Sequence, residues 1–381
     1  MEKEWSLLPD TSARAVEFSQ RIGTTPFTAA LLLHRGITSD EEARAFLHPE
    51  KQPFHDPFLM KDMEKAVSRI EQAIQAQERI VVYGDYDVDG ITATSLLCRN
   101  LRQLGAAADY FIPHRQKDGY GLHKETLDEI IAEGAGLIVT VDCGISAVEE
   151  AAAAKDKVDL IITDHHLPGK ELPKALAVID PHRADCAYPD KNIAGVGVAF
   201  KLCQALWQKM RGKAFTGDLD IVALGTVADV VPLLGENRKI VQQGLRVLKK
   251  SKRPGIQALL AVTELQEKEI TAGHIGFVLA PRLNAAGRLA SALRGVELLL
   301  TEDGEEAQAI AEELDAANRE RQAVEQEILQ AAEKQIEEID VKRAHVLVLH
   351  GEGWHPGVIG IVASRIVERY YRPTVIIAEE D

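Results

Sequence analysis

The feature that most constrains this chain is a recurring pattern in which acidic side chains follow short apolar runs. The run Val158–Ile162 leads into Asp164-His165-His166, which places one carboxylate beside two imidazoles. Runs of this length and composition are typical of buried strands. Three more clusters follow the same rule: Asp85, Asp87 and Asp89 after residues 79–82, Asp142 after residues 136–140, and Asp229 at the end of an apolar stretch beginning at Asp220.

Acids that converge on one point indicate bound cations, because carboxylates at short range repel one another and do not all stay ionised without compensation. Mixed carboxylate and imidazole ligands suit Mn²⁺ better than Mg²⁺, which prefers oxygen ligands and keeps its waters. So many ligands favour two ions over one. A pair of ions about 3.5–4 Å apart activates a water molecule on one side of a phosphorus centre and stabilises the leaving oxygen on the other. We therefore expect two divalent cations, Mn²⁺ preferred and Mg²⁺ as the alternative, and phosphoester hydrolysis.

The spacing of the apolar runs predicts an α/β fold with a parallel sheet. In open sheets of this kind, ligands bind outside the carboxyl ends of the strands, which is where Asp87, Asp142 and His165 fall. The five expected strands lie at residues 80–83, 108–112, 137–141, 160–163 and 177–179.

The chain divides into four expected parts. Residues 1–70 form an accessory helical region, in which Thr38-Ser39-Asp40-Glu41-Glu42 supplies a helix N-cap. Residues 71–303 form the catalytic domain. Residues 304–340 hold a connecting helix, at about Glu305–Glu338, which we expect to be a solvated spacer between two lobes. Residues 341–381 form a smaller α/β unit with a strand at His345–Leu349, a helix near Val358–Arg369 and a strand at Thr374–Ala378.

The composition excludes several classes of protein. A chain of 381 residues with 46% hydrophobic content is long enough for two domains and is not disordered. A net charge of −15 argues against a diffuse basic surface, so any contact with nucleic acid must come from local Arg and Lys clusters near a neutralised metal site. No apolar run approaches the roughly 18–20 residues of a membrane span. The four cysteines form no C-x-x-C pair and the start carries no apolar signal region, so we expect a cytoplasmic protein.

The four acidic clusters together resemble the DHH phosphoesterase family, whose triplet is Asp164-His165-His166 here. Within that family, the segments Gly84–Gly90, Pro281–Arg288 and Gly353–Gly360 are similar to RecJ-type exonucleases. The resemblance implies a parallel-sheet DHH catalytic domain joined by a long helix to a smaller DHH-associated domain. It also implies 5′ to 3′ hydrolysis of single-stranded DNA in DNA repair and recombination. We expect a monomer, with single-stranded-DNA-binding protein and a helicase as candidate partners.

Some individual roles follow from this resemblance. It makes Asp87 and Asp89 the strongest candidates for metal ligands, and it makes Asp85 either a ligand or a residue that contacts a ligand. Asp142 has the position of a bridging carboxylate at a strand end, and Asp229 sits among apolar residues where an unpaired charge would be costly. The alternatives are a solvated acidic turn or a helix N-cap for the first cluster and an Asx turn for Asp142. The expected metal ligands are Asp85, Asp87, Asp89, Asp142, His165 and Asp229.

The two histidines need separate roles, because neighbours at a strand end do not both point at one metal without a bend. The family pattern makes His165 the ligand and His166 a phosphate-facing group. Asp164 would then lie behind His165 and fix its tautomer. The expected catalytic residues are Asp87, Asp89, Asp142, His165, His166 and Asp229.

Two glycine-containing or basic loops are further candidates for phosphate contacts. Arg115 lies in a basic loop after a strand, and the resemblance implies that an arginine there holds a substrate phosphate bidentately. An ordinary loop is the alternative. Gly195-Val196-Gly197 precedes a helix and is either a tight helix entry or a set of amides aimed at an anion.

The later segments supply five more candidates. Arg282, Asn284 and Arg288 lie in a stretch too basic for plain core, which favours a phosphate or nucleic-acid contact over an interlobe salt bridge. His355 and Gly357 open a helix on a turn and would present its N-terminus to a phosphate, with structural turn chemistry as the alternative.

Other functions remain as alternatives. A short-oligonucleotide or cyclic-dinucleotide phosphodiesterase of the DHH family is disfavoured by the extra N-terminal segment and by Arg282–Arg288. An inorganic pyrophosphatase is disfavoured because Tyr83 stands where a histidine would precede the first metal acid, and because the second lobe carries Trp354–Gly360. An inactive DHH-like replication scaffold is disfavoured because every metal acid is present.

The second α/β unit looks unfinished, since one strand, one helix and the start of another strand in about 40 residues form a unit too small to be stable alone. We therefore expect a C-terminally truncated form of a longer protein. In that case the chain keeps the metal site but binds long single strands weakly, with a shallow salt dependence.

Overall fold

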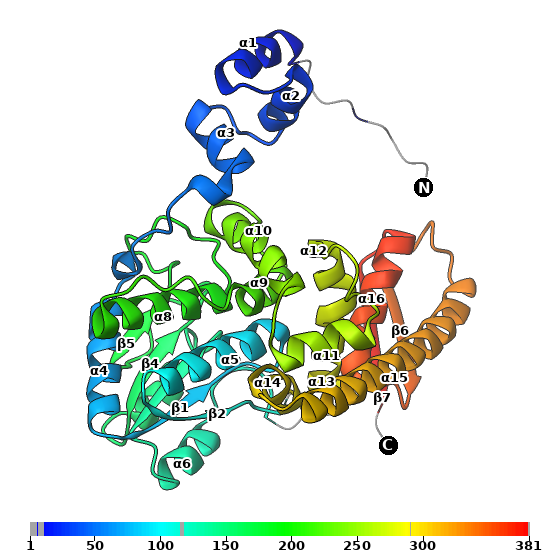
Figure 1. Ribbon diagram of the computed structural model, residues 1–381. Helices are drawn as coiled ribbons and strands as arrows, with labels where there is room; N and C mark the ends of the chain where they lie inside the picture. Colours follow the sequence, from blue (N-terminus) through cyan, green and yellow to red (C-terminus); the bar gives the residue numbers. More distant parts are fainter. Residues whose placement is uncertain (1–5, 7–10, 115–117, 290, 380–381) are drawn as a thin grey trace.

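Three short helices at the start of the chain form a unit of their own. In the computed structural model, which describes residue 6 and residues 11–114, 118–289 and 291–379, they are α1 (Ser12–Ile22), α2 (Pro26–His34) and α3 (Asp40–Leu47). The predicted N-cap is confirmed, because Ser39 and Glu42 form a reciprocal capping box. The unit buries a small core around Phe18 and Leu32 and projects from the rest of the molecule (Figure 1). Two 3-10 turns, η1 (Pro49–Lys51) and η2 (Pro57–Leu59), lead from it to the sheet.

The central element is a five-stranded sheet in which every pair of neighbours is parallel. The strands follow the order β2-β1-β3-β4-β5, and Ile80 pairs with Leu137 across β1 and β3. Strands covered on both faces read as continuous apolar runs, which is why their sequence signal is clear. All five predictions are confirmed to within one residue: β1 (Arg79–Tyr83), β2 (Ala107–Phe111), β3 (Leu137–Val141), β4 (Asp159–Thr163) and β5 (Ala177–Ile179).

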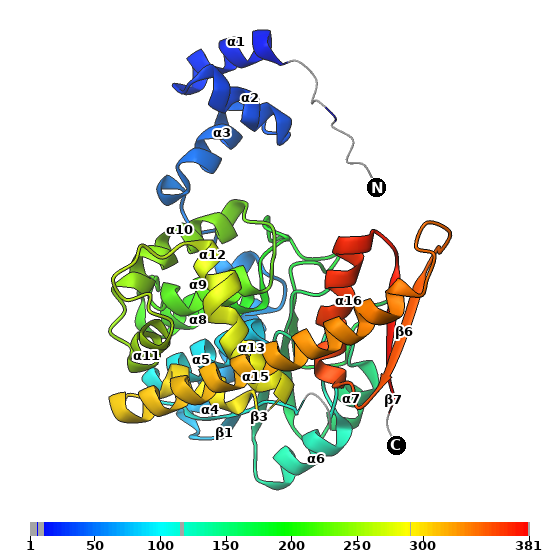
Figure 2. The same ribbon diagram turned by 90° about the vertical axis from the view of Figure 1, so that its right-hand side faces the viewer.

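Helices cover both faces of this sheet (Figure 2). On one face, α4 (Met63–Gln75), α5 (Val88–Gln103) and α8 (Gly195–Arg211) form the largest core with the strands. On the other face, α6 (Lys124–Ala132) and α7 (Val148–Ala154) form a second core. Helix α4 packs in the sheet's own core although it begins inside residues 1–70, so the separate helical unit ends before it.

After β5 the described chain up to residue 300 continues in helices. These helices form a third core with α5, and both α9 and α13 contact α5. The elements are α9 (Leu219–Ala228), α10 (Gly235–Lys249), α11 (Pro254–Val262), α12 (Ala272–His274), a π-helical turn η3 (Ile275–Leu279), α13 (Ala280–Leu289) and α14 (Leu293–Leu300).

The predicted connecting helix is α15 (Gly304–Glu337), but it is not a solvated spacer. Its first half buries Ile310 and Leu314 against α11 and α13, and its second half buries Ile328 in the core of the last unit. Even Glu325 is 1% exposed and forms ion pairs with arginines, including Arg321 one turn before it. The helix therefore packs against both lobes.

The last unit consists of β6 (Leu347–Glu352), α16 (Pro356–Tyr370) and β7 (Thr374–Glu379). The two strands pair in parallel, with Leu347 opposite Thr374, and one face of the pair packs on α15 and α16. The first strand begins two residues later than predicted and extends to Glu352. Among the described residues, no helix combines the length and the apolar character that a membrane crossing requires.

Candidate metal centre

The strand order brings acids that are distant in sequence to one point. β1 and β3 are neighbours, although β2 lies between them in the chain, so the strand order reverses at this pair. Such a reversal is where ligands bind in doubly wound sheets. Asp85 and Asp87 follow β1, Asp142 follows β3 and His165 follows β4. Asp229 reaches the same place from the C-terminal end of α9.

All six predicted metal ligands belong to groups with the spacing of a metal site. Within each group the ligand atoms lie within 4.8 Å of one another, and three groups are found among the described residues: Asp85, Asp87 and Asp142; Asp89, His165 and Asp229; and Asp142, His165 and His166. The first two groups share no residue, and the third connects them through Asp142 and His165. This arrangement offers two ion positions with Asp142 between them.

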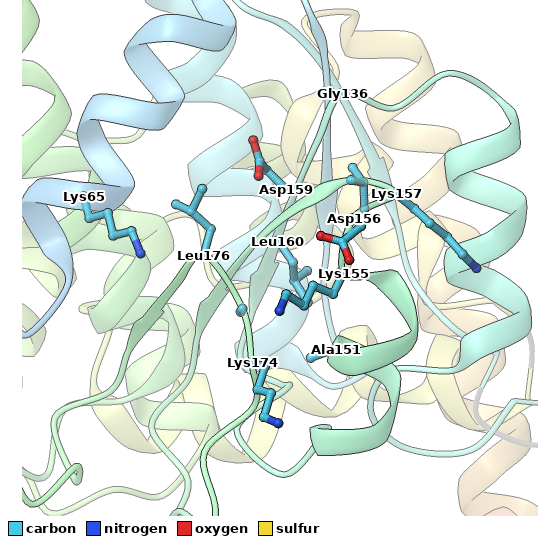
Figure 3. A pocket seen from close by; sticks show the side chains of 12 residues that line it. Lys65, Gly136, Ala151, Lys155, Asp156, Lys157, Asp159, Leu160, Lys174 and Leu176 are labelled. Atoms are coloured by element: carbon cyan, nitrogen blue, oxygen red, sulfur yellow. The ribbon is translucent and has the colours of Figure 1, made fainter.

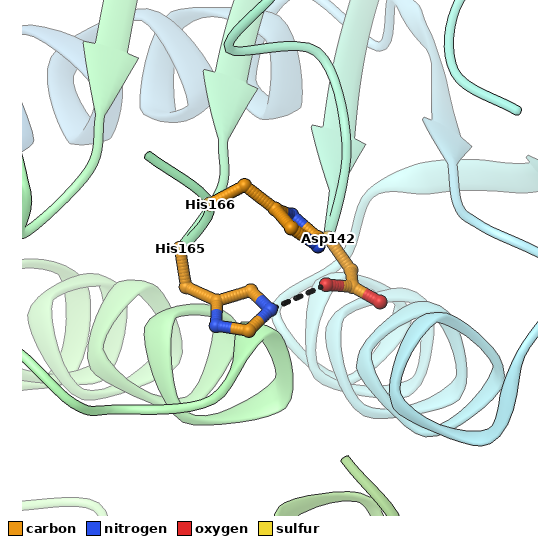
Figure 4. A group of neighbouring side chains, drawn as sticks. All are labelled: Asp142, His165 and His166. Atoms are coloured by element: carbon orange, nitrogen blue, oxygen red, sulfur yellow. Dashed lines mark ion pairs between the residues drawn. The ribbon is translucent and has the colours of Figure 1, made fainter. Parts of the chain in front are cut away.

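His165 belongs to two of these groups, and Figure 4 shows it beside Asp142 and His166. Its Nε2 atom is 3.1 Å from Asp142 Oδ1, 3.6 Å from Asp229 Oδ2 and 3.8 Å from Asp89 Oδ2. Burial lowers the pKa of His165, which favours the neutral imidazole that binds metals. The predicted ligand role of His165 thus has the required geometry and protonation state.

Asp89 is held in place by the start of α8. The Gly195 amide donates to Asp89 Oδ2 at 2.7 Å and the Val196 amide donates to Asp89 Oδ1 at 2.8 Å. A Cβ atom on Gly195 would lie 2.4 Å from Asp142 Oδ1, so only glycine fits there. Both interpretations of Gly195–Gly197 therefore apply: the helix entry is tight, and its amides point at an anion, which is the Asp89 carboxylate.

The carboxylates of the centre are only partly compensated by the protein itself. Burial, followed by repulsion from neighbouring carboxylates, raises the pKa of Asp89 and of Asp229 to about 7, and raises the pKa of Asp142 well above its ordinary value. Asp142 Oδ1, His165 Nε2 and Asp229 Oδ2 are buried without a hydrogen-bond partner among the described residues. Converging, unpartnered oxygen and imidazole atoms fit divalent cations.

The structure corrects the role of Asp164. Its Oδ1 atom lies 2.7 Å from Nδ1 of His166, not against the ring of His165. The same oxygen accepts the backbone amides of His165 and His166, and Oδ2 accepts the Ile145 amide at 2.9 Å. The chain therefore bends after β4 so that the second histidine folds back onto Asp164. This hydrogen bond raises the pKa of His166 to about 9, so the ring is a cation at neutral pH.

Comparison with known proteins agrees with this geometry. The model of the DHH family, N-terminal domain, matches residues 79–226. The single-stranded-DNA-specific exonuclease RecJ of Bacillus subtilis is 42% identical over 378 residues, which make up 99% of this chain and 48% of that protein. The crystal structure of an exonuclease RecJ bound to manganese has a TM-score of 0.77 at 39% sequence identity and covers 86% of this chain and 82% of that chain. The chain belongs to the RecJ family.

A RecJ structure from Thermus thermophilus in complex with Mg²⁺ has a TM-score of 0.75 at 33% identity, covering 97% of this chain and 50% of that one. The chain spans about half to two thirds of the length of the curated RecJ proteins that it matches, such as 48% of the Bacillus subtilis protein and 63% of the Escherichia coli protein.

The structure does not support all of the phosphate contacts that were predicted for this RecJ-family chain. Arg115 lies outside the described residues. The guanidinium of Arg282 donates to Asp315 Oδ1 at 2.8 Å and to the Val278 carbonyl at 2.7 Å, which is the salt bridge named as the alternative, here between α13 and α15. Asn284 is partly buried in α13, and the side chain of Arg288 is outside the described part.

His355 is the N-cap of α16, and its Nδ1 atom accepts the Gly357 amide at 3.1 Å. The turn chemistry named as the alternative is therefore present. This acceptor role for Nδ1 places the ring proton on Nε2. A phosphate contact by His355 and Gly357 stays a prediction.

Two residues near the centre were not predicted from the sequence. Asp180 directly follows β5, is fully buried, and has a pKa raised to about 7, first by burial. Like the other acids, it follows a short apolar strand, but no second acid or histidine directly adjoins it in the sequence. The hydroxyl of Tyr120 lies 3.3 Å from His166 Nδ1. This contact joins two loops, so no local sequence pattern predicts it.

A surface cavity of about 520 Å³ lies at the opposite, amino edge of the same sheet (Figure 3). Its wall includes the beginnings of β3 and β4, and Lys65, Lys155 and Lys174 come to it from three separate segments. No metal-ligating group among the described residues lies there. The chemistry of the RecJ-family chain is therefore concentrated at the carboxyl edge.

Proposed function

We propose that this chain carries the catalytic centre of a metal-dependent exonuclease that hydrolyses single-stranded DNA from the 5′ end. The observation that supports this most is the pair of separate ligand groups joined through Asp142 and His165, since two-metal sites are built to cleave phosphodiesters. The 5′ to 3′ polarity, the DNA substrate and a role in DNA repair and recombination rest on the family alone.

In this proposal Asp85, Asp87 and Asp142 hold one divalent cation. Asp89, His165 and Asp229 hold the other. Bound there, the ions supply a nucleophilic water at neutral pH and stabilise the leaving oxygen. Mn²⁺ is preferred over Mg²⁺ because the set includes an imidazole.

The side chains around the ions have their own tasks. The His166 ring, kept cationic by Asp164, donates a proton in a hydrogen bond to a substrate phosphate oxygen. The amides of Gly195 and Val196 fix the orientation of Asp89 before any metal arrives. A carboxylate that is already oriented loses little freedom on binding an ion, which favours tight and geometrically defined binding.

We further propose that the chain acts as a cytoplasmic monomer and works with single-stranded-DNA-binding protein and a helicase. The four cysteines, all buried and unpaired, are consistent with a reducing compartment.

A direct substrate comparison tests the function. Purified protein with Mn²⁺ is incubated with 5′- or 3′-labelled single-stranded DNA, the matching duplex, pyrophosphate and a cyclic dinucleotide. We expect mononucleotides from the 5′ end of the single strand, little cleavage of the duplex, and no activity in the Asp142→Asn variant. Faster hydrolysis of pyrophosphate or of the cyclic dinucleotide would support those functions instead, and no hydrolysis of any substrate would support the scaffold.

A further inference from the structure

Four exposed side chains with large apolar groups stand next to the metal centre, and we call them the apolar rim. They are Tyr120, Leu167, Val230 and Phe277, exposed to 47%, 79%, 85% and 87%. Exposure of this degree means that the fold itself gains little from burying them.

Three members of the rim are tied to the centre directly. Leu167 follows His166 in the chain, and Val230 follows the ligand Asp229. The Tyr120 hydroxyl lies 3.3 Å from His166 Nδ1, and the two rings meet edge to face with centroids 5.9 Å apart. Consecutive Cα atoms are about 3.8 Å apart, so Leu167 and Val230 cannot lie far from a substrate held at the centre.

Val230 occupies its position at a cost to the fold. Its φ angle is 60°, a left-handed conformation that is a genuine outlier for a β-branched residue. It comes immediately after the C-cap residue Asp229 of α9, at the position where helices usually end on glycine. Strain of this kind clusters at functional sites, where the side chain has a use that offsets it.

Phe277 lies on the π-helical turn η3. Such turns are rare in proteins, and those that occur are often found at functional sites. Ile275 and Leu279 on either side of it are buried, so the turn packs without using the Phe277 ring. The preceding residue, Gly276, packs against Val227, which lies two residues before Asp229. A Cβ atom added to Gly276 would be 3.9 Å from Val227 Cγ1. The turn therefore adjoins the end of α9 that carries Asp229 and Val230.

We propose that the apolar rim contacts the bases of the nucleotides on either side of the phosphate held at the metal centre, with Phe277 stacking on a base and Val230 packing against one. This inference rests on the proposed function. The bases are linked to that phosphate through the deoxyribose, and their flat apolar faces are exposed in a single strand but stacked and paired in a duplex. Stacking on aromatic side chains is the usual way in which proteins bind single strands without reading their sequence.

The rim explains how a chain with a net charge of −15 can bind DNA near its active site. The phosphate is bound by the cations, and the bases are bound by apolar contact. Little additional positive charge is then required around the centre.

The test compares Val230→Gly and Phe277→Ala with a matched control, Phe27→Ala. Phe27 is 74% exposed on α2, in the unit that projects away from the sheet (Figure 1). Both rim variants should raise KM for a single-stranded oligonucleotide about tenfold or more, and Phe277→Tyr should restore it. Phe27→Ala should leave KM unchanged. On an oligonucleotide with abasic sites at its first three positions, wild type and both rim variants should have equal KM.

Thermal unfolding separates this role from a structural one. Val230→Gly relieves the left-handed strain, so its midpoint temperature should rise by about 2 °C or more while binding becomes weaker. A lower midpoint temperature would mean that the fold needs Val230 and would overturn the argument for it.

Wild-type KM in Val230→Gly and Phe277→Ala on the normal strand would overturn the inference and leave the proposed function standing. Wild-type protein that cleaves no single strand at all would remove the proposed function itself, and the rim with it.

Discussion

At the carboxyl edge of the five-stranded sheet, acids face other acids, whereas at the amino edge they face arginine and lysine. Arg69 Nε lies 2.5 Å from Asp159 Oδ2 and its Nη2 lies 2.5 Å from Glu78 Oε2, and Lys157 pairs with Asp128 at 2.6 Å. At the carboxyl edge the buried atoms of Asp142 and Asp229 find no hydrogen-bond partner among the described residues.

The difference shows which edge can do chemistry. The carboxylates of Glu78, Asp128 and Asp159 at the amino edge are paired with cations of the protein itself, so they need no ligand. Burial, and after it repulsion between neighbouring carboxylates, raises the pKa of Asp142 and Asp229 at the carboxyl edge, so these groups are costly to keep ionised until cations arrive. Each prediction below tests one side of this contrast.

The largest effect is expected from removing a carboxylate at the carboxyl edge. Asp142→Ala or Asp229→Ala should lower nuclease activity by about three orders of magnitude or more, because each removes a ligand of the two-metal site. Lys155→Ala at the amino edge is the matched control and should keep wild-type activity. Near wild-type turnover of either aspartate variant at saturating Mn²⁺ would show that the centre is misassigned.

The two histidines should separate binding from turnover. His165→Ala should weaken Mn²⁺ affinity by about tenfold or more, because it removes a ligand shared by two groups. His166→Ala should lower kcat by about 100-fold with Mn²⁺ affinity nearly unchanged. Because Asp164 contacts the His166 ring, Asp164→Asn should behave like His166→Ala. Calorimetric Mn²⁺ titration with parallel kinetics distinguishes these results, and equal losses of affinity in both histidine variants would refute the division of roles.

The metal-free protein should become less stable as pH rises. Asp89 and Asp229 have a folded-state pKa of about 7 against an ordinary value of 3.8, so the fold binds extra protons and loses stability between about pH 4 and pH 7. His166, raised to about 9 from 6.5, stabilises the fold below pH 6.5, and this contribution is lost as pH rises through 9. The midpoint temperature should therefore fall by several degrees from pH 5.5 to pH 8.

Saturating Mn²⁺ should remove most of the aspartates' contribution to this pH dependence of the midpoint temperature, because the ions replace the protons on the aspartates. A midpoint temperature that rises with pH in metal-free buffer would contradict the incomplete compensation of the carboxyl edge.

The smallest effect is expected at the amino edge. Arg69→Met removes two ion pairs whose carboxylate partners are partly exposed to solvent, and should lower the free energy of unfolding by about 1 kcal/mol. Activity measured well below the midpoint temperature should stay at the wild-type level. A large loss of activity in this variant would show that the two edges are coupled.

Much of the carboxyl edge could be predicted from sequence because its signals are local. The three strands that lead to ligands, β1, β3 and β4, are largely apolar runs, and Asp87, Asp142 and His165 follow them. Parallel strands necessarily bring these ends to one edge, so the convergence of these side chains could be predicted without knowing the strand order.

The remaining features depend on contacts between distant segments. Asp164 binds His166 because of the bend after β4, and Asp89 caps α8, which begins more than 100 residues later. Arg282 forms an ion pair with Asp315 on α15, the helix that the sequence predicts to be a solvated spacer. Pairings of this kind follow from how helices pack, and a basic residue looks the same in sequence whether it meets a phosphate or a carboxylate.

Calorimetric titration of the metal-free protein with Mn²⁺ at pH 7, in two buffers of different ionisation enthalpy, tests the central claim most directly. The account predicts two ions per chain and a release of protons, because Asp89 and Asp229 have pKa values of about 7 before the ions bind. Asp142→Asn should weaken both binding events, since that residue lies between the two positions. Binding of no ion, or an unchanged titration in Asp142→Asn, would contradict the claim.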